Sequence, residues 1–445
     1  MSKPSSGSIG DRSSRVPTTA YFPLILNIGS TLLGGSGATV PLAQVIRASG
    51  YVVSTTLLIA GAVLTYCGSS LLVKACIRTG QTSYGDLAMH TLGRRGSIFV
   101  KTVIVLNSFG ECLAVMLLFK ETLWVGDDEP IKREHKVLFA AAVSLPIVVF
   151  VREFRRLAPL AFITALGALT LLVFIINRAF REGRYLDPGV VPFATGPMAD
   201  TTVLEAVSSV AISMVVQFNV LPVYVNVRIL ATDDAERVTY VVLVWGIGLA
   251  TIVYIATDVL SYVTFGAVDY DTIIDEYHSI WGGPLGVNAL AIGQLVSYPL
   301  IAHAGVTEIA NVLAGLERPR YFRAAAQEDP PGGKNEGTSL LPTTTAPPTA
   351  PPTDMFLAEG IAGMLWVVGT SCLAIAFSEA AHILNVVGAC CALPLMAIFP
   401  PLMILQTKPP DAADGDPLTF AYRMALYCGC TITAICVVVS IANFK

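Results

Sequence analysis

The sequence alternates between apolar stretches of 18 or more residues and short clusters of charged residues. A helix of about 20 apolar residues is long enough to cross the hydrocarbon core of a bilayer. The composition agrees with repeated crossings, because 54% of the residues are hydrophobic and only 13% are charged, against about 25% charged in soluble domains. We therefore predict an all-α polytopic membrane protein.

Charge and cysteine content exclude two other classes of protein. A net charge of -4 provides no basic excess to bind the phosphates of nucleic acids. All nine cysteines lie inside apolar stretches, which is typical of small buried hydrophobic residues, and they lack the neighbouring ligands of a metal site. A disulfide-rich secreted domain is excluded for the same reason.

Eleven transmembrane spans are expected from the apolar stretches. The fourth is short, and the first and sixth are long and interrupted by Gly or Pro. With the N-terminus in the cytosol, 19 of the 28 Lys and Arg residues lie on the inner side and nine on the outer side, as the positive-inside rule requires. The spans are expected at 19–48, 51–76, 97–123, 136–151, 157–178, 202–228, 238–266, 284–315, 356–377, 381–406 and 419–442.

Two polar segments accompany the membrane region. Residues 1–18 are expected to form a disordered cytosolic tail, and residues 19–445 a single transmembrane domain. Residues 317–354, between spans eight and nine, are rich in Thr and Pro. This composition predicts a disordered cytosolic loop rather than a second domain.

Inside this loop, Glu336, Leu340 and Leu341 have the spacing of an acidic dileucine sorting signal. A cytosolic loop would present the signal to sorting adaptors, which are therefore candidate partners. The signal keeps an endolysosomal or vacuolar membrane open beside the plasma membrane. The loop composition equally indicates a phosphorylatable tether.

Three glycines fall within four residues of the first span, at Gly34, Gly35 and Gly37, and Pro41 follows them. Both residue types weaken a helix, and a broken helix in hydrocarbon is tolerated only where it lines a cavity or contacts a ligand. In transporters such breaks bind small zwitterions, with the carboxylate at a half-helix N-terminus and freed carbonyls around the amine or a cation. The alternative is that the small residues allow close helix packing.

A second interruption is expected in the sixth span, at residues 217–224. Pro222 removes one helix hydrogen bond, and Gln217 and Asn219 bring amide groups to membrane depth. Spans one and six occupy equivalent places if spans one to five and six to ten are inverted repeats. Paired interruptions in corresponding spans are the best sequence indication of a binding site at the bilayer midplane.

Four segments resemble motifs of the amino acid/auxin permease family. Residues 27–41 are similar to its N-x-x-S/N-x-x-x-G-x-G-[IVL]-x-x-L-P opening, and residues 218–224 to its F-x-x-x-P-[IV]-Y motif. Residues 262–266 are similar to its G-Y-x-x-F-G ending of span seven, and residues 383–389 to its I-x-x-[IVL]-G-[AS] segment of span ten. The likeness runs in order through nearly all of the expected membrane domain.

This resemblance implies a fold like that of the bacterial leucine transporter, with ten spans in two inverted repeats plus one further helix, and secondary transport of amino acids. The family's second glycine is shifted or replaced here, because Ser36 stands within the glycine run. The implied substrate site comprises Ser30, Gly34, Gly35, Ser36, Gly37, Phe218, Asn219 and Pro222.

Sodium and protons are both candidate coupling ions. In sodium-coupled neutral members of the family, an Asn three residues after the first Asn joins a Thr of span eight around sodium. The matching positions are Ser30 and Ser297. A serine hydroxyl ligates a hard cation, but loss of the amide oxygen weakens the sodium case. Proton coupling or uncoupled exchange is at least as well supported.

Ionisable residues at membrane depth are rare and usually functional. Glu111 lies near the middle of span three, and we consider it a candidate to carry a coupled proton or to pair with a cationic substrate. Its alternative is a structural carboxyl bonded to a neighbouring hydroxyl. Asp258 is expected to have a packing role, and His303 to be a core histidine with proton relay as its alternative. Glu308, near a span end, is expected to be solvated.

These features favour a transporter with no bound cofactor other than a coupling ion. The alternative is a receptor-like nutrient sensor that binds an amino acid and signals through residues 317–354, because both would keep the same pocket. An enzyme would need a constellation of His, Cys or carboxylate groups at one depth. A channel would need a repeated polar face along several spans. The sequence contains neither pattern.

Overall fold

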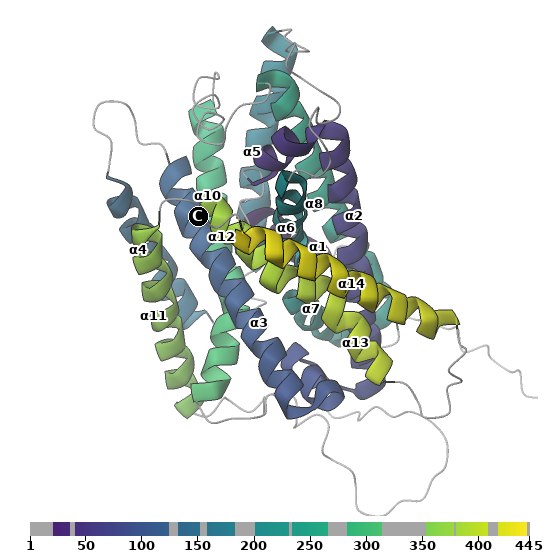
Figure 1. The fold of residues 1–445 in the computed structure, drawn as a ribbon. Helices are drawn as coiled ribbons and strands as arrows, with labels where there is room; N and C mark the ends of the chain where they lie inside the picture. The colour runs from purple at the N-terminus through teal and green to yellow at the C-terminus, as the bar shows by residue number, and fades with distance from the viewer. Residues whose placement is uncertain are drawn as a thin grey trace, which may run out of the picture.

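The computed structural model describes residues 21–35, 41–123, 132–151, 158–182, 201–230, 234–265, 283–313, 353–377, 380–407 and 417–442. The long elements in these ranges are all helices, and they form one bundle (Figure 1). The tail 1–18 and the expected loop 317–354, with Glu336, Leu340 and Leu341, lie outside the described residues.

Nine helical segments of the described chain are long and apolar enough to cross a membrane. The other two of the eleven expected spans correspond to the shorter α1 and to α4, which has 18 residues and begins with charged side chains. The elements are α1 (Phe22–Gly35), α2 (Pro41–Thr79), α3 (Tyr84–Thr122), α4 (Arg133–Phe150), α5 (Ala158–Glu182), α6 (Thr201–Met214), α7 (Gln217–Leu230), α8 (Ala235–Phe265), α10 (Gly283–Leu313), α11 (Thr353–Ala376), α12 (Ala380–Val387), η4 (Gly388–Ala392), η5 (Pro394–Ile398), α13 (Phe399–Gln406) and α14 (Pro417–Ala442).

Helix α3 is longer than the apolar stretch that predicts it. It begins at Tyr84 rather than at residue 97, because the Ser83 hydroxyl caps the helix by accepting the Asp86 N–H at 3.1 Å. A kink at Gly93, with φ of 72°, separates this polar first part from the membrane span. Hydropathy alone finds only the apolar second part.

Span ten is distorted along its length. Helix α12 passes directly into two consecutive π-helical segments, η4 and η5, before α13 completes the crossing. Pro394, at the start of η5, has no N–H to continue an α-helical ladder. π-Helical turns inside α-helices are frequent at functional sites, and the apolar pattern of span ten gives no indication of them.

Most of the buried hydrophobic residues in the described chain fall into two cores. The first core is formed by α1, α2, α5, α6, α7 and α8 with span ten and, mainly, the N-terminal half of α3. The second core is formed by the C-terminal half of α3 with α4, α10 and α11. Figure 1 shows α4 and α11 side by side at one edge of the bundle and α2 beside α8 towards the other, in agreement with their packing contacts.

Large apolar side chains also cover the outside of the bundle. Phe139, Phe180, Trp245 and Val438 expose more than half of their surface, and they belong to four different helices. In water such a surface would drive aggregation. Lipid tails solvate it, so the chain is an integral membrane protein.

Two lysines bond to the C-terminal ends of neighbouring helices. Lys120 of α3 is 5% exposed, and its Nζ donates to the carbonyl oxygens of Ala374 at 2.9 Å and Phe377 at 2.7 Å, at the end of α11. Lys136 of α4 donates in the same way to the carbonyl of Leu123, at the end of α3. Cations at these positions satisfy orphan carbonyls and the negative end of the helix dipole.

We expect Lys120→Met to lower the free energy of unfolding by about 1–3 kcal/mol, because the buried Ala374 carbonyl and the partly buried Phe377 carbonyl lose their charged donor. The apparent melting temperature of the detergent-solubilised protein measures this effect. Lys132→Met, at an exposed position, is the matched control and should leave the melting temperature unchanged. Equal melting temperatures for both variants would contradict the capping role.

Candidate functional site

The first interruption lies between α1 and α2. Helix α1 ends at Gly35, so Gly34 and Gly35 form its last turn, and α2 begins at Pro41. Proline suits a first helical position, because the N–H that it lacks would have no partner there. Ser36 and Gly37 lie between the two helices, outside the described residues.

The second interruption is real, but its expected position around Pro222 is wrong. Helix α6 ends at Met214 and α7 begins at Gln217, so the non-helical residues are Val215 and Val216. The Gln217 side chain explains the boundary, because its Oε1 accepts the Val216 N–H at 3.0 Å in place of a helix carbonyl. Pro222 lies inside α7, in its second turn.

A buried hydrogen-bond chain joins the two interrupted spans. Asn219 of α7 donates from Nδ2 to the Thr31 hydroxyl of α1 at 3.1 Å, and Thr31 donates to the Asn27 carbonyl at 2.9 Å. All three side chains are at most 2% exposed. The structure therefore brings Asn219 into direct contact with α1, as a shared site requires. The sequence analysis did not identify Thr31. It could have been found as a polar residue within an apolar stretch.

Ser30 and Ser297 lie on α1 and α10, which pack against each other. The Ser30 hydroxyl donates to the Asn27 carbonyl at 3.1 Å, and the Ser297 hydroxyl donates to the Gln294 carbonyl at 2.7 Å. Both serines are fully buried. Among the described residues, the buried Asn27 Oδ1 has no hydrogen-bond partner. This group of oxygens is suitable in chemical type for a hard cation.

Glu111 lies where α3 packs against span ten. It is 1% exposed, and its Oε1 accepts a hydrogen bond from Asn107 Nδ2 at 2.5 Å. The adjacent Gly110 is so close to α12 that an added Cβ would lie 2.4 Å from Val387 Cγ2. Burial of a charged carboxylate is costly, so Glu111 is a candidate to hold a proton.

Two other ionisable residues lie at membrane depth. Asp258 of α8 is 3% exposed, and its Oδ2 has no hydrogen-bond partner among the described residues. His303 of α10 lines a cavity with Thr307 and with Glu359 of α11. This cavity is bordered by α4, α10 and α11, the helices of the second core, rather than by the interrupted spans.

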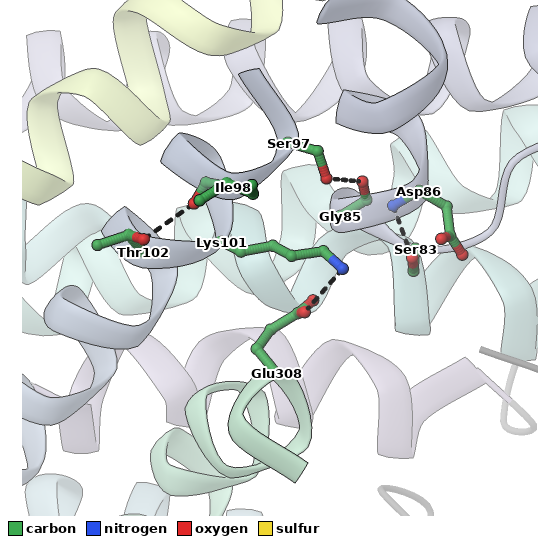
Figure 2. Close-up of polar contacts among 8 residues, drawn as sticks. All are labelled: Ser83, Gly85, Asp86, Ser97, Ile98, Lys101, Thr102 and Glu308. Carbon is green, nitrogen blue, oxygen red and sulfur yellow. Dashed lines mark hydrogen bonds and ion pairs between the residues drawn. The ribbon is translucent and has the colours of Figure 1, made fainter. Parts of the chain in front are cut away.

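The expectation that Glu308 is simply solvated is wrong. Its side chain is 14% exposed and pairs with Lys101 of α3, with Oε2 3.5 Å from Nζ (Figure 2). The pair covers Gly85, where an added Cβ would lie 2.5 Å from Lys101 Cε. Ser97 also donates to the Gly85 carbonyl at 3.0 Å. The ion pair joins α3 to the end of α10, and the Ser97 hydrogen bond holds the polar first part of α3 against the span that follows its kink.

A further polar contact connects α6 to span ten. Ser209 of α6 donates to Oδ1 of Asn385 in α12, and both side chains are buried. Gly388, one turn further along, lies so close to α6 that an added Cβ would be 2.1 Å from the Ser208 carbonyl oxygen. Span ten is therefore held against α6 on one side and α3 on the other.

Comparison with known proteins gives a consistent result. The model of the family described as transmembrane amino acid transporter protein matches residues 24–444. Amino acid transporter AVT6B of Arabidopsis thaliana is 21% identical over 64% of this chain and 64% of its own length, so the chain spans less than two thirds of that relative.

Two other relatives are similarly distant. Sodium-coupled neutral amino acid transporter 7 of Homo sapiens is 19% identical over 80% of this chain and 71% of its own length. Vacuolar amino acid transporter 5 of Schizosaccharomyces pombe is 22% identical over 66% of this chain and 70% of its own length.

Among solved structures, a Na+-coupled sialic acid symporter in a substrate-bound outward-open state has the same fold. Its TM-score is 0.56 at 11% sequence identity, and the match covers 96% of this chain and 90% of that chain. This confirms the expected fold, that of the bacterial leucine transporter.

We expect Thr31→Val to lower the free energy of unfolding by about 1–3 kcal/mol, because the buried Asn219 amide loses its acceptor. Thr170→Val is the matched control. The Thr170 hydroxyl also donates to the carbonyl four residues earlier, but that hydrogen bond is exposed and the residue on α5 is only half-buried. Apparent melting temperatures in detergent compare the two. A shift of equal size in both would contradict the link between α1 and α7.

Proposed function

Because the chain belongs to the transmembrane amino acid transporter family, we propose that it is a secondary transporter, and not an enzyme, that moves amino acids across a membrane by alternating access. The observation that carries this proposal is the pair of interruptions in spans one and six, joined by the hydrogen bond from Asn219 to Thr31. An interruption at membrane depth offers backbone groups to a ligand.

The two interruptions offer opposite partial charges to a zwitterion. The first N–H groups of α7, at Gln217 and Phe218, have no helix carbonyl one turn earlier, and they attract a carboxylate. The carbonyls at the end of α1, around Gly34 and Gly35, attract an ammonium group. Ser36 and Gly37 are assigned to the same site from the sequence. Asn219 and Pro222 shape its α7 side.

We propose the proton as coupling ion and Glu111 as its carrier. A fully buried carboxyl bonded to a neutral amide binds and releases a proton as its access to water changes. Sodium is the second candidate. It is favoured by the unpartnered Asn27 Oδ1 near Ser30 on α1, with Ser297 on the adjacent α10, although serine replaces the amide of the sodium-coupled members at position 30.

An endolysosomal or vacuolar membrane is the location that we propose. The fission yeast relative carries the name of a vacuolar transporter, and Glu336, Leu340 and Leu341 give this chain a candidate signal for sorting adaptors. We also propose a cytosolic N-terminus, from the distribution of Lys and Arg residues.

Uptake into proteoliposomes tests the function. We expect radiolabelled amino acids to be taken up in an acid-driven manner, with no dependence on sodium. With the membrane potential held at zero, a one-proton symporter would accumulate a zwitterionic substrate at most about tenfold for each unit of pH difference. Sodium-dependent uptake would transfer the coupling role from Glu111 to the Ser30 region. Tight binding with no flux would favour the nutrient sensor, and neither binding nor flux across an amino acid panel would refute both.

We expect Glu111→Gln to abolish accumulation driven by a pH gradient while leaving substrate exchange intact, because glutamine keeps the shape and the hydrogen bond but carries no proton. Accumulation ratios with and without a pH gradient measure the change. Glu236→Gln, at an exposed position on α8, is the matched control. A wild-type response to the gradient in Glu111→Gln would remove Glu111 from the mechanism.

A further inference from the structure

One face of α2 lies against the interruption of span six. Gly61, Thr65 and Gly68 are spaced four and three residues apart, so they share a helix face. An added Cβ at Gly61 would lie 2.8 Å from Val210 Cγ1 in α6, and one at Gly68 would lie 2.5 Å from the Met396 carbonyl oxygen in η5. These close approaches bring the backbone of α2 near both distorted spans.

Thr65, between the two glycines, contacts the interruption directly. Its hydroxyl donates to the Met214 carbonyl at 2.7 Å, and its own carbonyl accepts from Gln217 Nε2 at 3.4 Å. The other end of the Gln217 amide accepts the Val216 N–H at 3.0 Å. Thr65, Met214, Val216 and Gln217 are at most 2% exposed, so water does not compete for these groups.

These side chains take the places of two specific helix hydrogen bonds. In a continuous helix, the Val216 N–H would donate to the Ile212 carbonyl, and the Phe218 N–H would donate to the Met214 carbonyl. The Gln217 side chain occupies the first of these donors, and the Thr65 hydroxyl satisfies the second of these acceptors, so the Met214 carbonyl does not need the Phe218 N–H. Both contacts reduce the drive for Val215 and Val216 to rewind into a continuous span.

We propose that Thr65 is a positioning residue that keeps the Phe218 N–H available to the substrate carboxylate. It does so by satisfying the Met214 carbonyl, which would otherwise be the helix partner of that N–H. The inference rests on the proposed function for the identity of the ligand. The backbone geometry that it requires is independent of transport.

Removal of the hydroxyl leaves the Met214 carbonyl without a partner in a dry environment, where an unsatisfied group is strongly disfavoured. The nearest donor that can replace it is the Phe218 N–H. In Thr65→Val the span therefore rewinds locally, and the substrate loses a donor. We expect KM to rise about tenfold, the effect of one lost hydrogen bond of ordinary strength, with a smaller change in kcat.

Two comparisons separate this role from simple packing. Thr65→Ser keeps the hydroxyl and should restore wild-type KM, whereas Thr65→Ala should behave like the valine variant. Thr56→Val, on the exposed face of the same helix, removes a hydroxyl that donates only to the Val52 carbonyl at 2.8 Å and should have no effect. If serine and alanine variants have the same KM, or if Thr65→Val keeps wild-type KM, the proposal is wrong.

Hydrogen–deuterium exchange of the purified protein gives a second readout that does not need transport. Peptides covering residues 213–219 should exchange more slowly in Thr65→Val and Thr65→Ala than in the wild type, because rewinding protects the Phe218 N–H. Loss of packing alone would make them exchange faster, and that result, or unchanged exchange, would overturn the proposal. Slower exchange in a protein that transports no amino acid would refute the proposed function and leave the role of Thr65 standing.

Discussion

The structure depends on one constraint, that backbone polar groups surrounded by hydrocarbon must find partners within the protein. An intact helix meets it alone, but spans one, six and ten are not intact α-helices. In each of these spans, a backbone carbonyl accepts a hydrogen bond from a side chain of a neighbouring helix. Tyr254 of α8 donates to the Leu32 carbonyl near the end of α1, and Thr65 of α2 donates to Met214 at the end of α6. The irregular segments are thus stable because regular helices surround them.

The two hydrophobic cores meet at helix α3. The interrupted spans belong to the first core, whereas α4, α10 and α11 belong to the second. Helix α3 contributes to both, and Glu111 lies near the position where its side chains change from one core to the other. A movement of one core relative to the other would alter the surroundings of the Glu111 carboxyl more than those of groups inside either core. If Glu111 carries the proposed proton, its uptake and such a movement would be coupled at this place.

The sequence predicts the architecture well, because the length of each apolar stretch and the Gly and Pro residues that interrupt it can be recognised within a single segment of the chain. It places the first interruption correctly at the Gly34–Gly35 end of α1. It misplaces the second, since Pro222 is tolerated within α7, while the break lies at Val215 and Val216, where the Gln217 side chain accepts the Val216 N–H. It also misses the π-helical turns of span ten and the contacts of Thr65. The hydrogen bond from Thr65 to Met214 joins residues 149 positions apart, and no local pattern reports it.

Many contacts between helices in this protein are made to main-chain oxygens rather than to side chains. Lys120 binds carbonyls of α11, Thr164 of α5 donates to Gly293 of α10 at 3.0 Å, and Tyr84 donates to Leu395 of η5 at 3.3 Å. A carbonyl is present whatever residue carries it. The accepting helix can therefore change its side chains over evolutionary time without losing the contact, while the donor position cannot. Such one-sided contacts provide a physical route by which a fold persists at the 11% identity that separates this chain from the symporter.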